Sequence, residues 1–138
     1  MNRSKIALGM IVKDDDEVDV LKRTWDSVAP YVDGIYITVP QKPYEKLQEL
    51  ARKYGANVDL RPGEFNHTIP KEEVKWLRKV LKYEPHCKAS DVIFKFSDAR
   101  NANMAFIPDE YDWLFWIDAD DVLMNGPGLR TIADNAFL

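Results

Sequence analysis

Hydrophobic residues follow two spacings along the chain, one typical of buried strands and one typical of amphipathic helices. Ile6–Val12 is a continuous apolar run with β-branched members, as expected of a strand buried on both faces. Apolar residues then recur at helical spacing and predict a helix over about Glu17–Ala29. A strand over Ile35–Val39, a helix between Pro43 and Gly55, and a short strand over Asn57–Leu60 follow. This order of elements predicts a parallel sheet with right-handed crossovers.

The stretch from Glu64 to Lys95 interrupts this order, and we expect it to be an elaboration laid over the sheet. It contains one clear amphipathic pattern, which predicts a helix over about Lys71–Tyr83. Leu77 and Leu81 are expected to pack inward from this helix. Its lysines are expected in solvent: Lys71, Lys75, Lys79 and Lys82. No repeat or linker divides the chain, so residues 1–138 are expected to form one domain.

The last third of the chain returns to the alternation of helix and strand. Ser97–Phe106 is a predicted helix, with Ser97 as its N-cap. Trp113–Ile117 is apolar at every position, which predicts a central strand with both faces buried. A final helical pattern includes Ile132, with Asp134 expected in solvent. The whole pattern is that of an α/β fold, with a mostly parallel, Rossmann-like sheet flanked by helices.

Composition and charge narrow the function classes. The 138 residues are 46% hydrophobic and 30% charged, which is typical of a globular domain and not of a disordered chain. With a net charge of −4, the chain lacks the basic balance that favours nucleic-acid binding, so no nucleic-acid partner is expected. The single cysteine, Cys87, excludes an internal disulfide and is expected to be a partly buried structural thiol.

The sequence does not predict membrane insertion or secretion. The longest apolar stretches, Ile6–Val12 and Trp113–Ile117, are far shorter than the roughly 20 residues of a spanning helix. The first residues imitate a secretion signal, but Lys13–Glu17 stands where a small-residue cleavage site would be. We therefore expect no membrane span and a cytoplasmic protein.

Asp118-Ala119-Asp120, at the end of the apolar strand, is the strongest candidate for chemistry. Ligands of open α/β sheets bind beyond the carboxyl ends of the strands. In an extended segment Asp118 and Asp120 point the same way, and a divalent cation such as Mg²⁺ or Mn²⁺ relieves the repulsion between their carboxylates. The alternative is that these acids form a solvated turn or cap the next element.

Two further segments are candidates for contacts with a nucleotide. Phe96–Asn101 opens a helix, whose free N–H groups and dipole favour an anion, and Arg100 adds a fork of donors suited to phosphate. An ordinary helix start with a surface arginine explains the same residues. Lys13–Glu17 either lines a nucleotide pocket or places acids at a helix N-terminus, where the helix dipole favours them.

The histidines and tryptophans form no recognisable functional pattern. His67 and His86 have no second ligand at metal spacing and are expected at the surface. The tryptophans fall on or near apolar faces and are expected in the core rather than as platforms for sugar stacking: Trp25, Trp76, Trp113 and Trp116.

Taken in order, these segments resemble the N-terminal half of a family 2 glycosyltransferase with the GT-A fold. Many members open with a strand that ends in Lys-Asn-Glu, which Met10–Asp14 echoes here. They later carry a phenylalanine and an Ala-Arg-Asn helix start, here Phe96 and Ala99–Asn101. An aromatic strand that ends in Asp-x-Asp follows, here Asp112–Asp120. The chain departs from the family at Thr38–Gln41, where many members have an acidic turn after the second strand.

The resemblance implies that a nucleotide-diphosphate sugar, foremost a UDP-sugar, binds with Mn²⁺ or Mg²⁺ for inverting transfer to an acceptor hydroxyl. Asp118 and Asp120 would form the metal site, with Asp120 on the cation and Asp118 on the ribose or a metal-bound water. The remaining donor contacts would come from Val12, Lys13, Asp14, Arg100, Asn101 and Ala119. A whole GT-A domain is usually much longer, so the chain is expected to be the donor-binding half, truncated after Asp-x-Asp, with the catalytic base unassigned.

Two alternative functions are compatible with the same motif. A haloacid-dehalogenase-like phosphatase also carries Asp-x-Asp after an apolar strand, and Asp118 would then be the phosphorylated residue, although that motif usually follows the first strand. A non-catalytic module would bind the nucleotide sugar without turnover.

Overall fold

The computed structural model describes residues 3–55 and 57–136. The chain forms two compact units. The first unit combines residues 1–64 with residues 99–138, and the second consists of residues 65–98. The second unit therefore covers nearly the same residues as the expected elaboration at 64–95, and each unit is described by itself below.

The first unit is built on a four-stranded parallel sheet with the strand order β3-β2-β1-β6. The strands are β1 (Ile6–Ile11), β2 (Gly34–Val39), β3 (Val58–Pro62) and β6 (Trp113–Trp116). At the centre of the sheet, Gly9 pairs with Tyr36 on one side and with Trp116 on the other. The parallel sheet and the α/β class predicted from the sequence are thus confirmed.

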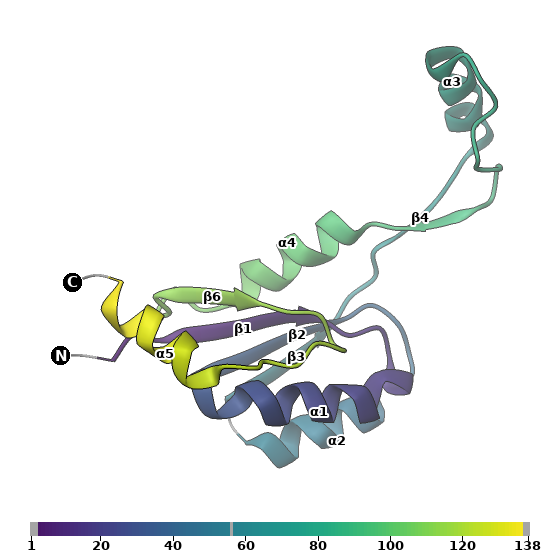
Figure 1. Cartoon of the computed structure of the whole chain (residues 1–138). Helices are drawn as coiled ribbons and strands as arrows, with labels where there is room; N and C mark the ends of the chain where they lie inside the picture. Colours follow the sequence, from purple (N-terminus) through teal and green to yellow (C-terminus); the bar gives the residue numbers. More distant parts are fainter. Residues whose placement is uncertain (1–2, 56, 137–138) are drawn as a thin grey trace. The chain divides into compact units, whose positions relative to one another are not determined.

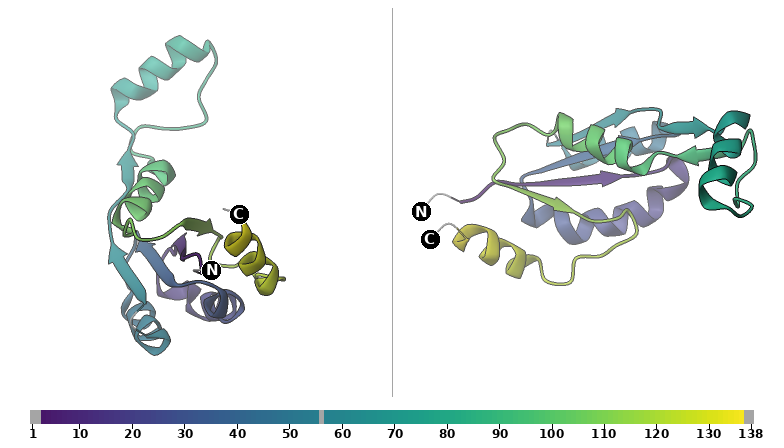
Figure 2. Two further views of the ribbon diagram at one scale, coloured as in Figure 1. Left: turned by 90° about the vertical axis from the view of Figure 1, so that its left-hand side faces the viewer. Right: turned by 90° about the horizontal axis from the view of Figure 1, so that it is seen from above.

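Helices cover both faces of this sheet. The helices α1 (Val18–Val28) and α2 (Glu45–Tyr54) lie on one face, and α4 (Phe96–Phe106) lies on the other (Figure 1). Figure 2 shows the same arrangement from two further sides. Short 3-10 turns at Asp15–Glu17 and Ala29–Tyr31 flank α1. The last helix, α5 (Gly126–Asn135), lies against the second of these turns.

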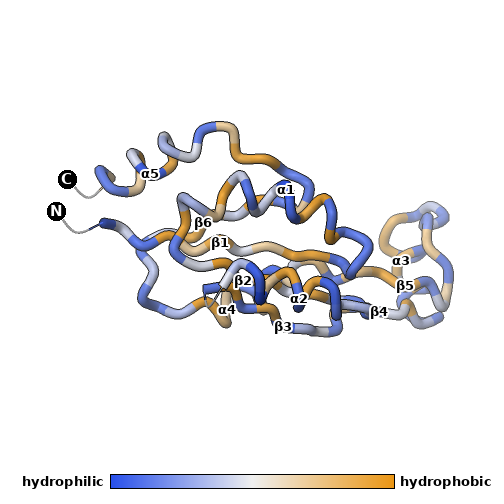
Figure 3. Tube along the Cα trace, turned by 90° about the horizontal axis from the view of Figure 1, so that it is seen from below, coloured by the Kyte–Doolittle hydropathy of each residue, from blue (hydrophilic) through white to orange (hydrophobic). Residues whose placement is uncertain are grey.

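The core of the first unit lies between the sheet and the α1–α2 layer. Hydrophobic residues run along β1 in the middle of the sheet (Figure 3). The largest fully buried core side chains come from the strands and the inner faces of both helices: Leu8, Met10, Val12, Leu21, Trp25, Val28, Ile37, Val39 and Leu47. Burial of such side chains is the main favourable term in folding, at about 1.5–3 kcal/mol each.

The opposite face of the sheet is tied to α4 by one buried asparagine. Asn103 is fully buried, and its Nδ2 donates to the carbonyl oxygens of Met10 and Tyr36 and to Thr38 Oγ1, at 3.2, 2.9 and 3.1 Å. A Cβ added to Gly9 would lie 2.6 Å from Asn103 Oδ1. The absence of a side chain at Gly9 therefore lets α4 approach the sheet closely.

Tyr54, the last residue of α2, links that helix to α1. Its ring packs edge-on against Trp25 at a centroid distance of 5.0 Å, and its hydroxyl donates to the carboxylate of Asp26. Burial, followed by the hydrogen bond and the negative charge of Asp26, raises the pKa of Tyr54 from 10.0 to about 12.

This raised pKa predicts an alkaline loss of stability. The folded state holds the Tyr54 proton more tightly than the unfolded state, so the contribution is complete below pH 10 and is lost as the pH rises towards about 12. Tyr54→Phe should therefore lose less stability than the unchanged protein between pH 9 and 11 in urea melts. Tyr111, whose pKa is also raised by burial and by its bond to Tyr36, is present in both proteins and so serves as a constant background.

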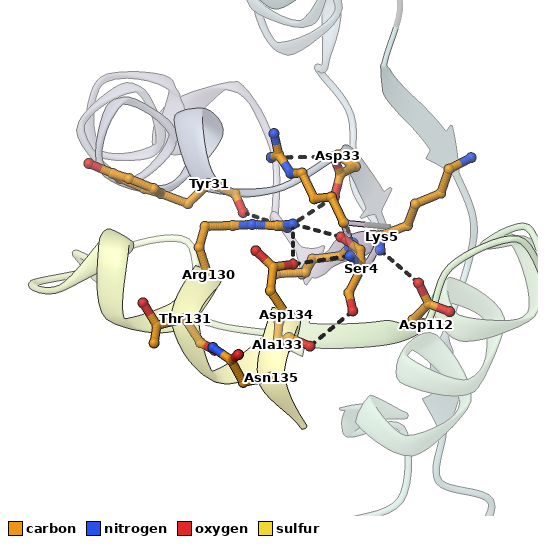
Figure 4. Close-up of polar contacts among 12 residues, drawn as sticks. Ser4, Lys5, Tyr31, Asp33, Asp112, Arg130, Thr131, Ala133, Asp134 and Asn135 are labelled. Carbon is orange, nitrogen blue, oxygen red and sulfur yellow. Dashed lines mark hydrogen bonds and ion pairs between the residues drawn. The ribbon is translucent and has the colours of Figure 1, made fainter. Parts of the chain in front are cut away.

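At the N-terminal ends of the strands, Arg130 of α5 forms hydrogen bonds with the segments that precede β1 and β2 (Figure 4). Its side chain is 12% exposed, and Nη2 donates to Ser4 O at 2.7 Å and to Asp134 Oδ1 at 2.8 Å. Nη1 donates to Asp33 Oδ2 at 3.2 Å and to Tyr31 O at 3.5 Å. One guanidinium thus joins α5, the segment before β1 and the segment before β2.

The second unit contains the antiparallel pair β4 (Asn66–Thr68) and β5 (Val92–Phe94), and the helix α3 (Lys71–Leu81). Its buried centre is small and consists of Ile69, Val74 and Pro85. The sequence did not predict β4 and β5, because three residues are too few to show a period.

The structure corrects the prediction that Trp113–Ile117 is a central strand. In the part of the chain that the structure describes, β6 pairs only with β1 and forms one edge of the sheet. Leu114 is 42% exposed. An apolar pattern reports that the faces of a strand carry hydrophobic side chains, but it carries no information on whether both edges are paired.

Two details of the predicted helices are also wrong. The helix α4 already includes Phe96, so Ser97 lies in its first turn and not at the N-cap position. The helix α3 ends at Leu81 because Lys82 has a left-handed backbone with φ of 60°. The four lysines expected in solvent, three in α3 and Lys82 just after it, are all exposed.

Burial of the α3 side chains also differs from the prediction. Val74 is the buried residue of α3, Leu77 is half-buried and Leu81 is 37% exposed. Trp76 is 59% exposed, which contradicts a place in the core, whereas Trp25 is fully buried as predicted. The small second unit has too few residues to cover the whole apolar side of its helix.

Among the described helices, none combines the length and the hydrophobicity that crossing a membrane requires.

Candidate functional site

The carboxyl ends of three parallel strands meet at one edge of the first unit. β1 ends at Ile11, β2 at Val39 and β6 at Trp116. Since Gly9 pairs with Trp116, the residues that follow β1 and β6, Val12 and Asp118 among them, leave the sheet side by side. This is the edge where open α/β sheets bind ligands.

The acidic motif forms a turn at this edge. The amide of Asp121 donates to Asp118 O at 3.1 Å, and Asp121 Oδ2 accepts from the amide of Asp118 at 3.0 Å. The extended geometry expected for Asp118–Asp120 is therefore wrong. Ala119 is buried, whereas Asp118 and Asp120 on either side of it are exposed. The turn therefore presents two carboxylates to solvent.

Two hydroxyl groups of α1 hold this turn in place. Thr24 Oγ1, which is fully buried, donates to Ala119 O at 2.7 Å. Ser27 Oγ accepts from the amide of Leu123 at 3.0 Å and donates to Thr24 O at 2.6 Å. Neither residue was predicted from the sequence, although two hydroxyl side chains three positions apart lie on one side of a helix and indicate a polar contact there.

Arg100 reaches the same edge from the other face of the sheet. Its guanidinium lies 4.8 Å from the ring centroid of Trp116, a cation–π contact two residues before Asp118. Arg100 and Asn101 are both exposed. Since Asn103, one turn further along α4, is bonded to Met10 O and Thr38 Oγ1, the N-terminal part of α4 lies towards the carboxyl ends of β1 and β2.

The acidic segment after β1 has mainly local contacts. Val12 is fully buried and Lys13 is exposed, with its amide donating to Glu17 Oε2 at 2.5 Å. Asp14 is 3% exposed and accepts from the amide of Asp16 at 2.9 Å, which caps the 3-10 turn. Asp15 is 7% exposed and accepts from the amide of Leu47 at 2.9 Å, in the first turn of α2.

These contacts support the interpretation in which acids stabilise helix starts. They leave Lys13 as the exposed charge of the segment nearest to the end of β1. One oxygen of Asp14 is engaged in capping, so a donor contact from this residue stays a prediction.

The acid of the C-terminal segment lies elsewhere. Asp134 accepts from Arg130 Nη2 and, at 3.0 Å, from the amide of Ser4, which precedes β1 (Figure 4). It therefore sits at the amino ends of the strands and not at the edge that carries Asp118. Its role is to anchor α5.

The chemistry of the acidic turn fits a hard divalent cation. Asp118 and Asp120 offer oxygen ligands in solvent, and Mg²⁺ is usually bound by one or two carboxylates together with substrate phosphates. Within residues 3–55 and 57–136, no group of three or more His, Cys, Asp and Glu side chains gathers as a complete metal site. A cation here would thus depend on its ligand for the remaining positions.

The chain matches no known protein-family model, and it has no significant match among curated proteins.

Proposed function

We propose that the first unit binds a nucleotide-diphosphate sugar together with Mn²⁺ or Mg²⁺, as the donor-binding part of a family 2-like glycosyltransferase of the GT-A fold. The observation that carries this proposal is the anchored turn directly after β6, which presents the carboxylates of Asp118 and Asp120. Cationic Lys13 and Arg100 flank the same edge. Paired acids for a metal beside cations for phosphate are the groups that a diphosphate requires.

Each residue has a distinct role in this proposal. Asp120 binds the cation, and Asp118 contacts the ribose or a water on the cation. Arg100, oriented by the ring of Trp116, donates to a phosphate oxygen, and Lys13 adds a second positive charge. When bound, the cation neutralises the charge that develops on the leaving diphosphate.

The backbone of the turn favours donor binding because it is already held in place before the donor binds. Thr24 and Ser27 hold the backbone of residues 119–123, so donor binding does not have to order this loop. Sugar transfer with inversion also needs an acceptor hydroxyl and a carboxylate base within hydrogen-bond reach. Asp134 does not serve as that base, because it is bonded to Arg130 at the other end of the sheet.

The test is calorimetric titration of UDP, and of UDP-sugars, at several Mn²⁺ concentrations. The unchanged protein should bind more tightly as Mn²⁺ rises. Asp120→Asn should lose this metal dependence and keep the fold, because it removes one of two negative charges from an exposed turn. Asp109→Asn, an equivalent change at an exposed acid outside the site, is the control and should bind as the unchanged protein does.

Metal-independent binding of equal strength in both proteins would contradict the proposed site. Hydrolysis of phosphate monoesters with a phosphorylated Asp118 would replace it with the phosphatase alternative. Donor binding without acceptor-dependent release of UDP would identify the described chain as a binding module.

A further inference from the structure

The second unit contains a pocket of about 470 Å³ that the proposed donor site does not use. It lies between α3 and the loop that follows it. Its lining includes four cationic side chains, Lys71, Lys75, Arg78 and Lys88, and one carboxylate, Glu84. The volume is in the range of small-molecule sites, about 300–1,000 Å³.

Three of the cations come from one side of α3. Positions 71, 75 and 78 follow the spacing of a single helix face, the same face on which Val74 is buried. Lys88 faces them from the loop. The positive charge is therefore concentrated on both walls of one cavity, whereas two other exposed lysines, Lys79 of the helix and Lys82 just after it, do not line it.

The walls of the pocket are held by specific contacts. Arg78 Nε donates to both carboxylate oxygens of Glu84 at 3.0 Å, and Nη2 donates to Oε1 at 2.8 Å. The amide of Lys88 donates to Asp91 Oδ2 at 2.7 Å, and Pro85 of the same loop is buried. The Arg78–Glu84 pair joins the start of the loop to α3, whereas the bond between Lys88 and Asp91 lies within the loop itself.

The charge of this cavity is only partly balanced. Glu84 compensates Arg78, and the lining leaves the ammonium groups of Lys71, Lys75 and Lys88 without an acid of their own. Ammonium groups are compact point charges that bind phosphate, while Val74 and Pro85 supply an apolar floor. A ligand that suits both features has a phosphate group and an uncharged remainder.

We propose that this pocket binds a phosphate-bearing ligand through Lys71, Lys75 and Lys88, separately from the nucleotide sugar at the first unit. The phosphate belongs either to a soluble phosphate ester or to a phospholipid headgroup. This pocket requires neither Asp120 nor a divalent cation. A test of phosphate binding here is therefore independent of a test of the proposed function.

Cys87 offers a direct readout, because it lines the pocket and is the single thiol of the chain. We propose to measure the rate at which Ellman's reagent modifies Cys87, in EDTA, with and without inorganic pyrophosphate or glycerol 3-phosphate. A second arm uses vesicles of phosphatidic acid, with phosphatidylcholine vesicles as the uncharged comparison. At a ligand concentration about tenfold above its dissociation constant, modification should be about tenfold slower.

The variants Lys75→Glu and Lys79→Glu form a matched pair on one helix. Both lysines are exposed and both changes reverse one charge, but only Lys75 lines the pocket. Lys75→Glu should abolish the protection of Cys87, and Lys79→Glu should keep it. Circular dichroism of both variants should match the unchanged protein, since neither side chain is buried.

Protection of Cys87 by pyrophosphate or glycerol 3-phosphate would identify the ligand as a soluble phosphate compound, and protection by phosphatidic acid vesicles alone would identify it as a phospholipid headgroup. Absence of protection by all of these probes, or equal loss in both variants, would overturn the proposal. Protection should persist in Asp120→Asn, which separates this result from that of the donor site.

Discussion

Replacing Gly9 with valine should destabilise the protein by about 3 kcal/mol or more, a large part of the total stability of an ordinary domain. A Cβ at this position would lie 2.6 Å from Asn103 Oδ1 and 3.1 Å from side-chain atoms of Leu114 and Trp116. The asparagine is not free to move aside, because its Nδ2 is bonded to both β1 and β2. Urea unfolding followed by circular dichroism measures the loss.

A pair of milder changes tests the cause of this loss. Gly9→Ala adds only the Cβ, and in the background of Asn103→Ala the atom that it meets is gone. The cost of Gly9→Ala should therefore be smaller in that background, although Asn103→Ala itself costs about 1–3 kcal/mol through unsatisfied buried groups. Equal costs in the two backgrounds would mean that α4 does not pack on β1 as described.

Removing the guanidinium of Arg130 should be the second large effect, at about 3 kcal/mol, the lower end of the range for buried ion pairs. Arg130→Met keeps the length of the side chain but leaves Asp134 without its cation and Asp33 with Arg3 alone, at 3.5 Å. The Arg130 side chain is 12% exposed, whereas those of Asp33 and Asp134 are 27% and 35% exposed, so water solvates the two carboxylates in part and lowers the cost. Thermal and urea unfolding should both show the change.

An exposed ion pair at the same end of the sheet provides the control. Lys5 Nζ lies 3.3 Å from Glu110 Oε2, with side chains that are 50% and 58% exposed. Lys5→Met should cost less than about 1 kcal/mol, as surface pairs do. A similar loss of unfolding free energy in both variants would contradict this prediction. It would show that the positive charge at this end of the sheet matters, and not the hydrogen bonds of Arg130.

The elements of the first unit could be predicted from the sequence because each has a strong period. Ile6–Ile11 forms a buried strand and Val18–Val28 an amphipathic helix, close to their expected bounds. The edge position of β6 could not be predicted, because it depends on which strands pair and not on the residues of β6. Local patterns determine elements, whereas pairing is a property of the whole chain.

The candidate site was predicted in the same partial way. The location of Asp118 and Asp120 at the carboxyl end of a strand followed from the order of the elements. The turn that holds them did not, because it depends on Thr24 and Ser27, which are about 95 residues away in the sequence. The contact between Arg100 and Trp116 was equally hidden, since one residue belongs to a helix and the other to a strand.

The central position of β1 has a consequence for how the chain reaches its fold. β1 is the first strand in the sequence, yet one of its neighbours is β6, and Gly9 pairs there with Trp116. Ser4 Oγ donates to Ala133 O across a separation of 129 residues. Contacts between such distant residues close large loops and slow folding. During synthesis, one edge of β1 therefore stays unpaired until β6 has been made more than 100 residues later, and an unpaired strand edge of this kind is prone to aggregation.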